Sequence, residues 1–284
     1  MSNWKPLSPS TLHRLDLGVA LGMTDVGTVR SSNEDNFLID EKLGLIALAD
    51  GMGGHEAGEV ASADALNAVA SFIRAATSDD GDATVPSFHR SEFDPHQTDP
   101  DATWTDAAMR AMITLHDAVE FANERMYQTN VANERDEGGM GTTLTGLWQA
   151  MPDGPLFVFH VGDSRLYRMR HGQLTQLTRD QTLYQQAIEA GAVVHLPPRN
   201  LLLQALGPAP ELKPDLLTQA VSPGDLYMLC SDGLYGASEE TSIAAVLASA
   251  HADNLDAACS TLINMAKQDG SRDNITVVLI KCKG

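Results

Sequence analysis

Residues 45–55 constrain the fold of this chain more than any other stretch. Apolar residues run from Leu45 to Ala49 and stop at one carboxylate, Asp50. Three of the next four residues are glycines. The apolar run predicts a buried strand that places Asp50 at the rim of a sheet. The glycines let the backbone turn sharply there and approach a ligand closely. Because Asp-Gly is also a common turn, the recurrence of this pattern elsewhere in the chain is what gives it weight.

The net charge limits the partners that the chain can bind. A formal charge of −19 over 284 residues argues against nucleic acid and anionic membrane surfaces, since both require clustered Lys and Arg. An anionic substrate would need bound divalent cations to be accepted at all. We expect a soluble, cytoplasmic monomer, because residues 1–17 lack the apolar core of a signal peptide and no apolar run approaches the roughly 20 residues that span a bilayer. The three cysteines show no paired spacing and fit reduced thiols.

Short strands and pairs of helices occur in separate groups along the chain. Apolar runs predict strands at residues 17–23, 37–39, 44–49, 141–149, 156–161, 165–170, 174–177, 225–230 and 275–281. Apolar positions with a period near 3.6 predict helices at residues 56–75, 104–128, 239–250 and 254–268. Since strands and helices do not alternate regularly, this order predicts an α+β fold with two mostly antiparallel sheets covered by helices.

Two segments have the composition of loops. Residues 77–102 are rich in Asp, Pro, His, Ser and Thr and predict an exposed or disordered insertion loop. Residues 179–207 mix a short helical pattern with prolines and predict an irregular surface segment. No linker divides the chain, so we expect residues 1–16 to be an N-terminal extension and residues 17–284 to form a single domain.

Further acidic residues repeat the setting of Asp50. Each lies at a strand boundary beside a small residue or directly before a strand: Glu34, Asp35, Asp163, Asp232 and Asp273. Carboxylates that converge raise one another's pKa unless cations hold them. Oxygen ligands favour Mg²⁺ or Mn²⁺, whereas zinc is disfavoured because the histidines and cysteines show no ligand spacing. Taken singly, each Asp is also explained by a turn or a helix cap.

Six motifs follow one another over about residues 18–281. They are Asp25-x-Gly27-x-x-Arg30-x-x-Asn33-Glu34-Asp35, Ala49-Asp50-Gly51-Met52-Gly53-Gly54-His55, Gly141-Thr142-Thr143, Gly162-Asp163-Ser164-Arg165, Ser231-Asp232-Gly233 and Asp273-Asn274. Together they resemble the metal-dependent serine/threonine protein phosphatases of type 2C (the PPM family), in its bacterial form. The resemblance implies a four-layer α-β-β-α sandwich with a two-metal centre at one end of its central sheets.

The resemblance also assigns roles to matching residues. Asp50 would bridge two Mn²⁺ or Mg²⁺ ions, with the carbonyl of Gly51 as a further ligand. Asp232 and Asp273 would complete the shell of one ion. Asp163, together with Asp232, would hold a weaker third ion. The remaining acidic residues, Glu34 and Asp35, would act mostly through ordered waters around the site.

Two further segments match the family with less definite roles. His55 is open to three interpretations: a proton donor to the leaving oxygen, a substrate contact, or a residue at a helix N-terminus. Residues 179–207 correspond to the family's flap, a loop beside the active site thought to influence substrate choice. Arg199 and Asn200 within it could contact a phosphopeptide.

The implied activity is hydrolysis of phosphoserine and phosphothreonine in phosphoprotein substrates, opposing a bacterial Ser/Thr kinase. Two adjacent cations lower the pKa of a bridging water from about 16 to about 7, and the resulting hydroxide can attack phosphorus in line. Arg30 matches the family's phosphate-binding arginine, and a guanidinium can hold two phosphate oxygens at once.

Other functions stay open as alternatives. A catalytically lapsed, phosphoprotein-binding regulator on the same fold is disfavoured because the expected metal-binding aspartates are all present. A metal-dependent phosphodiesterase or nuclease is disfavoured by a pI near 4.6 and the lack of a basic stripe. The glycines of residues 51–54 match neither a dinucleotide-binding fingerprint nor a P-loop.

Overall fold

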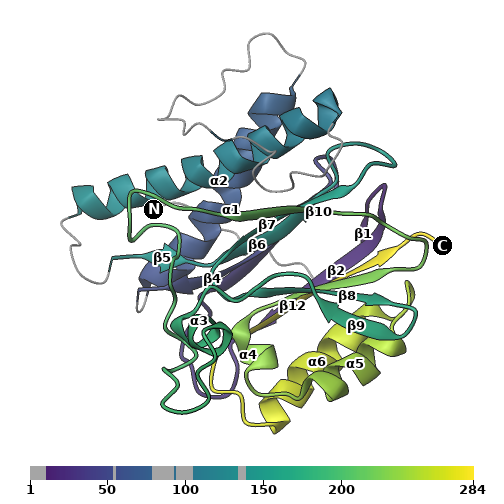
Figure 1. Cartoon of the computed structure of the whole chain (residues 1–284). Coiled ribbons are helices and arrows are strands. Elements are labelled where there is room, and N and C mark those ends of the chain that lie inside the picture. Colours follow the sequence, from purple (N-terminus) through teal and green to yellow (C-terminus); the bar gives the residue numbers. More distant parts are fainter. Residues whose placement is uncertain (1–10, 54–55, 79–92, 94–104, 134–138) are drawn as a thin grey trace.

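Two antiparallel sheets lie face to face at the centre of the molecule, and helices cover both outer faces (Figure 1). The computed structural model describes residues 11–53, 56–78, 93, 105–133 and 139–284. Every strand pairing within these residues is antiparallel. The predicted α+β class, with its four layers in the order α-β-β-α, is therefore confirmed.

The first sheet has the strand order β1-β2-β12-β11-β8-β9. Its strands are β1 (His13–Arg14), β2 (Gly18–Asp25), β8 (Arg165–Arg170), β9 (Gln173–Gln176), β11 (Leu226–Cys230) and β12 (Ile275–Cys282). Strands β2 and β12, from opposite ends of the chain, pair along eight residues each. This pairing closes the domain, because both ends of the sequence must be in place before the sheet is complete.

The second sheet has the order β10-β7-β6-β4-β3, and β5 pairs with the end of β4. Its strands are β3 (Asp35–Asp40), β4 (Leu45–Met52), β5 (Gly141–Thr142), β6 (Leu144–Trp148), β7 (Leu156–Val161) and β10 (Asp215–Gln219). Strand β4 is thus an interior strand, with the edge strand β3 on one side and β6 on the other.

Two pairs of helices cover the sheets. Helices α1 (Glu56–Thr77) and α2 (Asp106–Ala132) pack on the sheet that contains β4, and α5 (Glu240–Ala248) and α6 (Leu255–Gln268) pack on the other (Figure 1). The shorter helices are α3 (Leu183–Glu189) and α4 (Asp232–Tyr235). In the described part of the chain, no helix combines the length and hydropathy that crossing a bilayer requires.

The uninterrupted apolar run before Asp50 is explained by burial on both faces of β4. Leu45, Ala47 and Ala49 belong to the core beneath α1 and α2. Ile46 and Leu48 belong to the core between the two sheets. A strand covered on both faces carries apolar residues at every position, which is why this one shows no alternation.

Several elements differ from the sequence prediction. The strand expected at residues 141–149 is divided at Thr143 into β5 and β6, and the turn expected at residues 231–233 opens helix α4. Strand β10 was not predicted, because it is an edge strand with little apolar content. Strand β1 lies inside the stretch expected to be an extension, and Leu15 beside it is buried.

The segment at residues 77–102 is described only at Thr77, Ser78 and Phe93, so most of the predicted insertion loop lies outside the described residues. The ring of Phe93 stacks on His116 of α2, with 4.2 Å between the ring centroids. Phe93 also packs against the core beneath α1 and α2. The insertion therefore contacts the folded domain at this residue.

Two buried asparagines of α2 hold the backbone near residue 207. The amide of Asn130 donates to the carbonyls of Met140 (2.8 Å) and Gly207 (3.1 Å), and its oxygen accepts from the Met140 N–H (3.0 Å). The oxygen of Asn123 accepts from the Gly207 N–H (2.8 Å), and its amide donates to the Ala209 carbonyl (3.0 Å). These side chains complete the hydrogen bonding of buried loop backbone that has no sheet partner.

We predict that Asn130→Ala lowers the free energy of unfolding by about 2–4 kcal/mol, because it leaves buried backbone groups without hydrogen-bond partners. Asn133→Ala is the matched control, since Asn133 is exposed on the same helix and bonds only the Thr129 carbonyl with its side chain. Urea denaturation of both variants measures the difference. Equal destabilisation by the two substitutions would contradict the role given to Asn130.

Candidate metal centre

Five of the acidic residues singled out from the sequence line one cavity of about 780 Å³. They are Glu34, Asp50, Asp163, Asp232 and Asp273. Gly51 and Arg30 line the same cavity. The acidic residues come from five separate chain segments, each at a strand end or in the turn beside it, so the fold brings together positions up to 239 residues apart in the sequence.

The pairing of β3 with β4 sets Asp35 directly opposite Asp50. Asp35 is 3% exposed, and its Oδ2 accepts hydrogen bonds from the hydroxyls of Ser231 and Thr276, both at 2.7 Å. Its Oδ1 is buried without a hydrogen-bond partner in the described structure. The carboxylate is therefore fixed by one oxygen, while the other retains unused acceptor capacity.

The backbone around Asp50 is fixed by two threonines. The Asp50 N–H donates to Oγ1 of Thr143 (3.0 Å), and the Asp50 carbonyl accepts from the Thr143 N–H (2.9 Å) and the Thr142 hydroxyl (2.9 Å). Thr143 also shares a hydroxyl–hydroxyl hydrogen bond of 2.8 Å with Ser164. Thr143 lies between β5 and β6, and its backbone N–H bonds the Asp50 carbonyl. Its side chain connects Asp50 to Ser164, in the turn that carries Asp163.

Asp163 and Asp232 are held by a second set of contacts. Asp163 lies in the turn between β7 and β8, and its carbonyl accepts from the Tyr235 hydroxyl (2.9 Å). The guanidinium of Arg165 lies 3.6 Å from the ring centroid of Tyr235 and forms a bidentate pair with Asp180 (2.7 and 2.8 Å). Tyr235 belongs to α4, the helix that begins at Asp232, so this packing fixes the two carboxylates relative to one another.

Asp273 and Asn274 close the cavity from the start of β12. Nη2 of Arg30 donates to Asp273 at 2.7 Å, with the Arg30 side chain 52% exposed at the rim. The amide of Asn274 donates to the carbonyls of Val26 (3.1 Å) and Ser32 (2.9 Å), and its oxygen accepts from the Glu34 N–H (2.9 Å). Asn274 therefore fastens the loop that carries Arg30 and Glu34 to the start of β12.

The electrostatics of the cluster disfavour ionisation. Burial raises the pKa of Asp35 and of Asp163 to about 6 and that of Asp232 to about 8, and the charges of neighbouring carboxylates add to these shifts. Burial, then the charges of Asp35 and Asp232, raises the pKa of Asp50 well above its usual range. A bound cation would reverse this effect, because it stabilises the ionised form of every carboxylate around it.

The donor set fits a hard divalent cation. The candidate ligands that line the cavity are carboxylate oxygens and the Gly51 carbonyl. Asp35 does not line the cavity, but its buried Oδ1 has no hydrogen-bond partner in the described structure. No group of three or more His, Cys, Asp or Glu side chains in the described part of the chain stands as a ready-made ion site. The carboxylates share one cavity, but in this arrangement they do not form a ready-made coordination shell.

Residues 28–276 match the family model described as Protein phosphatase 2C. The chain belongs to the protein phosphatase 2C family. Over 261 residues it is 34% identical to the serine/threonine protein phosphatase PstP of Mycobacterium tuberculosis, covering 90% of this chain and 43% of PstP. It thus spans less than half of that relative's length. It is 30% identical to the serine/threonine phosphatase stp of Listeria welshimeri, covering 91% of this chain and 93% of stp.

The structural comparison agrees with this family assignment. A crystal structure of the PstP catalytic domain in complex with two manganese ions superposes with a TM-score of 0.70 at 32% identity. The match covers 93% of this chain and 98% of that one. The resemblance found from the six sequence motifs is confirmed.

Residues 179–207, the segment expected to be the flap, contribute to one wall of the cavity. Leu183 at the start of α3 and residues 200–205 line it. The flap is attached at its base, where Gln181 donates its N–H to the Gly162 carbonyl (2.8 Å) and accepts from the Gly162 N–H through its side chain (2.8 Å). Arg199 lies over the Tyr184 ring at 4.5 Å, and of the two flap residues expected to meet a phosphopeptide only Asn200 lines the cavity.

The sequence analysis did not assign the residues that position the carboxylates. Ser231, Asn274 and Thr276 carry that role, and each adjoins a motif carboxylate or follows it within three positions. A small polar residue at a strand end beside a buried Asp is the signal that could have found them. His55 lies outside the described residues.

We predict that stability in a chelator falls as pH rises from 5 to 8. The pKa values of Asp35, Asp163 and Asp232 are raised in the folded protein. Their contribution to the free energy of unfolding is therefore full below the unfolded-state pKa of about 4 and is lost as the pH rises through 6–8. Asp232→Asn should therefore be more stable than wild type at pH 8, by on the order of 2 kcal/mol, and little different at pH 5.

The matched control is Asp153→Asn, which alters an exposed turn residue outside the cluster. Urea denaturation in EDTA at the two pH values measures both variants. If Asp153→Asn gained as much stability at pH 8 as Asp232→Asn, net charge rather than the cluster would be responsible.

Proposed function

We propose that this chain hydrolyses phosphoserine and phosphothreonine in proteins with two divalent cations, Mn²⁺ or Mg²⁺, and that it opposes a bacterial Ser/Thr kinase as a cytoplasmic monomer. The observation that carries the proposal is the convergence of five acidic residues on one cavity that has Arg30 at its rim. The manganese-bound relative supports the choice of cofactor.

The cations would be held by residues that already line the cavity. Asp50 would serve both core ions, the Gly51 carbonyl would be a further ligand, and Asp232 and Asp273 would complete the shell of one ion. Asp163 with Asp232 would hold a weaker third ion, and Glu34 and Asp35 would accept hydrogen bonds from waters around the site. When bound, the ions would supply Lewis-acid neutralisation of the phosphoryl group and lower the pKa of the water that attacks phosphorus.

The protein's own groups account for binding and orientation. Arg30 would bind the phosphate by charge-assisted hydrogen bonds at the open rim of the cavity, where a phosphoprotein can reach it. The hydrogen bonds from Thr143 and Asn274 hold Asp50 and Asp273 in position. The two side chains therefore lose little conformational freedom when substrate binds. The role of His55 as proton donor, substrate contact or helix residue remains part of this proposal.

Two observations weigh against the alternatives. A lapsed regulator on this fold has no use for a cluster in which burial opposes ionisation, yet five of the six acidic residues singled out from the sequence line one cavity. A phosphodiesterase acting on nucleic acid would need basic surface around the cavity, and Arg30 is the only Lys or Arg that lines it among the described residues.

We predict Mn²⁺-dependent release of phosphate from a phosphothreonine peptide, with no cleavage of a phosphodiester substrate. Asp50→Asn should reduce kcat/KM by at least about a thousandfold, since it removes the carboxylate proposed to bridge both ions. Asp153→Asn is the exposed control and should retain wild-type activity. Phosphate release measured with and without Mn²⁺ decides the matter; binding of the phosphopeptide without turnover would support the lapsed regulator.

We predict that Arg30→Ala raises KM for the phosphothreonine peptide by about tenfold to a hundredfold, because it removes a charge-assisted contact to phosphate. Its metal content should stay close to that of wild type. Arg125→Ala is the matched control, since Arg125 on α2 is another exposed arginine paired with an aspartate, Asp64, but it does not line the cavity. Loss of bound manganese from Arg30→Ala, measured by elemental analysis, would contradict a role in phosphate binding.

A further inference from the structure

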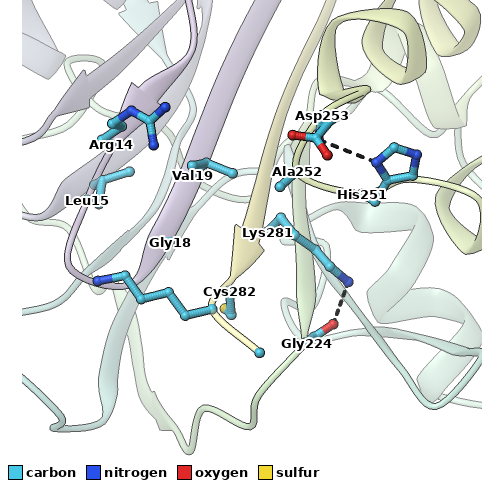
Figure 2. A pocket seen from close by; sticks show the side chains of 12 residues that line it. Arg14, Leu15, Gly18, Val19, Gly224, His251, Ala252, Asp253, Lys281 and Cys282 are labelled. Atoms are coloured by element: carbon cyan, nitrogen blue, oxygen red, sulfur yellow. Dashed lines mark hydrogen bonds between the residues drawn. The ribbon is translucent and has the colours of Figure 1, made fainter.

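A second cavity, of about 760 Å³, lies around one end of β2 and β12 (Figure 2). Gly18 and Cys282, which pair at one end of β2 and β12, line it. The carboxylate cavity is beside the opposite end of the same two strands, where Asp25 pairs with Ile275. Eight residues of β12 at about 3.3 Å each separate the two cavities by roughly 25 Å, so the second cavity is a distinct site. We call it the basic cavity.

The basic cavity concentrates positive charge on a strongly acidic protein. Arg14, Lys281 and Lys283 are among its twelve lining residues, whereas the whole chain has 19 Lys and Arg in 284 residues. His251 adds a further titratable nitrogen, and Asp253 is the only acidic side chain in the lining. With twice as many acidic as basic residues in the chain, this local excess of cations makes the cavity attractive to an anion.

Two of these cations are not committed to carboxylates. The side chains of Arg14 and Lys283 have no ion-pair partner among the described residues, and both residues are exposed. Lys281 donates to the carbonyl of Gly224 at 2.6 Å, a contact drawn in Figure 2. By contrast, Arg165 and Arg170 elsewhere in this sheet are each paired with an aspartate. The cations of the cavity thus retain hydrogen-bond donors for a ligand.

The interior of the basic cavity is apolar. Leu15, Val19, Ala252 and Cys282 contribute to its lining, and Leu15 and Cys282 belong to the core between the sheets. Figure 2 shows Arg14 and Leu15 on one side and His251 to Asp253 on the other, with the ends of β2 and β12 between them. A bare inorganic anion would leave this apolar surface unused, whereas a ligand with an apolar body would bury it.

We propose that the basic cavity binds an amphipathic organic anion, in which a carboxylate, sulfonate or phosphate group is attached to an apolar body. The anionic group contacts Arg14 and Lys283 at the rim, and the apolar body lies against Val19 and Ala252. The volume lies within the range of sites that hold small organic molecules. This inference is independent of the phosphatase activity and of the cations at the carboxylate cavity.

The test uses two probes with the same aromatic body, 8-anilinonaphthalene-1-sulfonate and the uncharged N-phenyl-1-naphthylamine, titrated by fluorescence into the full chain in EDTA. The sulfonate probe should bind at one saturable site, more tightly than the neutral probe. The Arg14→Ala/Lys283→Ala variant should weaken the sulfonate probe by about tenfold or more and change the neutral probe by less than about twofold. High salt should weaken only the sulfonate probe.

The control Arg110→Ala/Arg125→Ala makes the same change in net charge on α2, over the other sheet, and should leave both affinities unchanged. Ala252→Trp fills the cavity and should abolish the fluorescence signals of both probes. If this variant does not fold, the result for Arg14→Ala/Lys283→Ala, which changes two exposed residues, decides alone. Unchanged binding of the sulfonate probe to Arg14→Ala/Lys283→Ala would overturn the proposal. Displacement of the probe by millimolar inorganic phosphate would also overturn it, because phosphate has no apolar body.

Discussion

The burial of several carboxylates close together, with their mutual repulsion added to it, is the constraint on which the rest of this structure depends. Asp35, Asp50, Asp163 and Asp232 all have raised pKa values, and burial is the first cause in each case. Such a cluster does not assemble for its own stability. It is held in place by strands buried on both faces, whose apolar packing stabilises the fold enough to offset the repulsion at their ends.

Neutral hydrogen-bonding groups hold the carboxylates in position at the ends of these packed strands. Thr143 holds the backbone of Asp50, Ser231 and Thr276 hold the side chain of Asp35, and Asn274 joins the loop before β3 to the start of β12. None of these groups adds charge to the cavity. They therefore fix the carboxylates without neutralising them, which preserves their capacity for cations.

The sequence predicted the parts of this site that depend on local patterns and missed those that depend on pairing. An apolar run that stops at Asp50 identifies a strand end from composition alone. The setting of Asp35 opposite Asp50 depends on strand register, and the contact of Arg30 with Asp273 joins residues 243 positions apart. Strand β10 escaped prediction for a related reason: an edge strand with one buried residue has almost no hydrophobic signature.

The ion pair between Arg30 and Asp273 shows how one residue can serve both the fold and the substrate. In the described structure Arg30 uses only Nη2 for Asp273, so the donors on Nε and Nη1 stay available at the rim. A guanidinium has five N–H donors in a planar fork and can contact a carboxylate on one edge and a phosphate on another. A lysine at this position would have three donors on a single nitrogen and would lack the planar fork that offers two parallel donors to one partner. The same side chain can thus keep Asp273 at the cavity and present hydrogen bonds to an incoming phosphate.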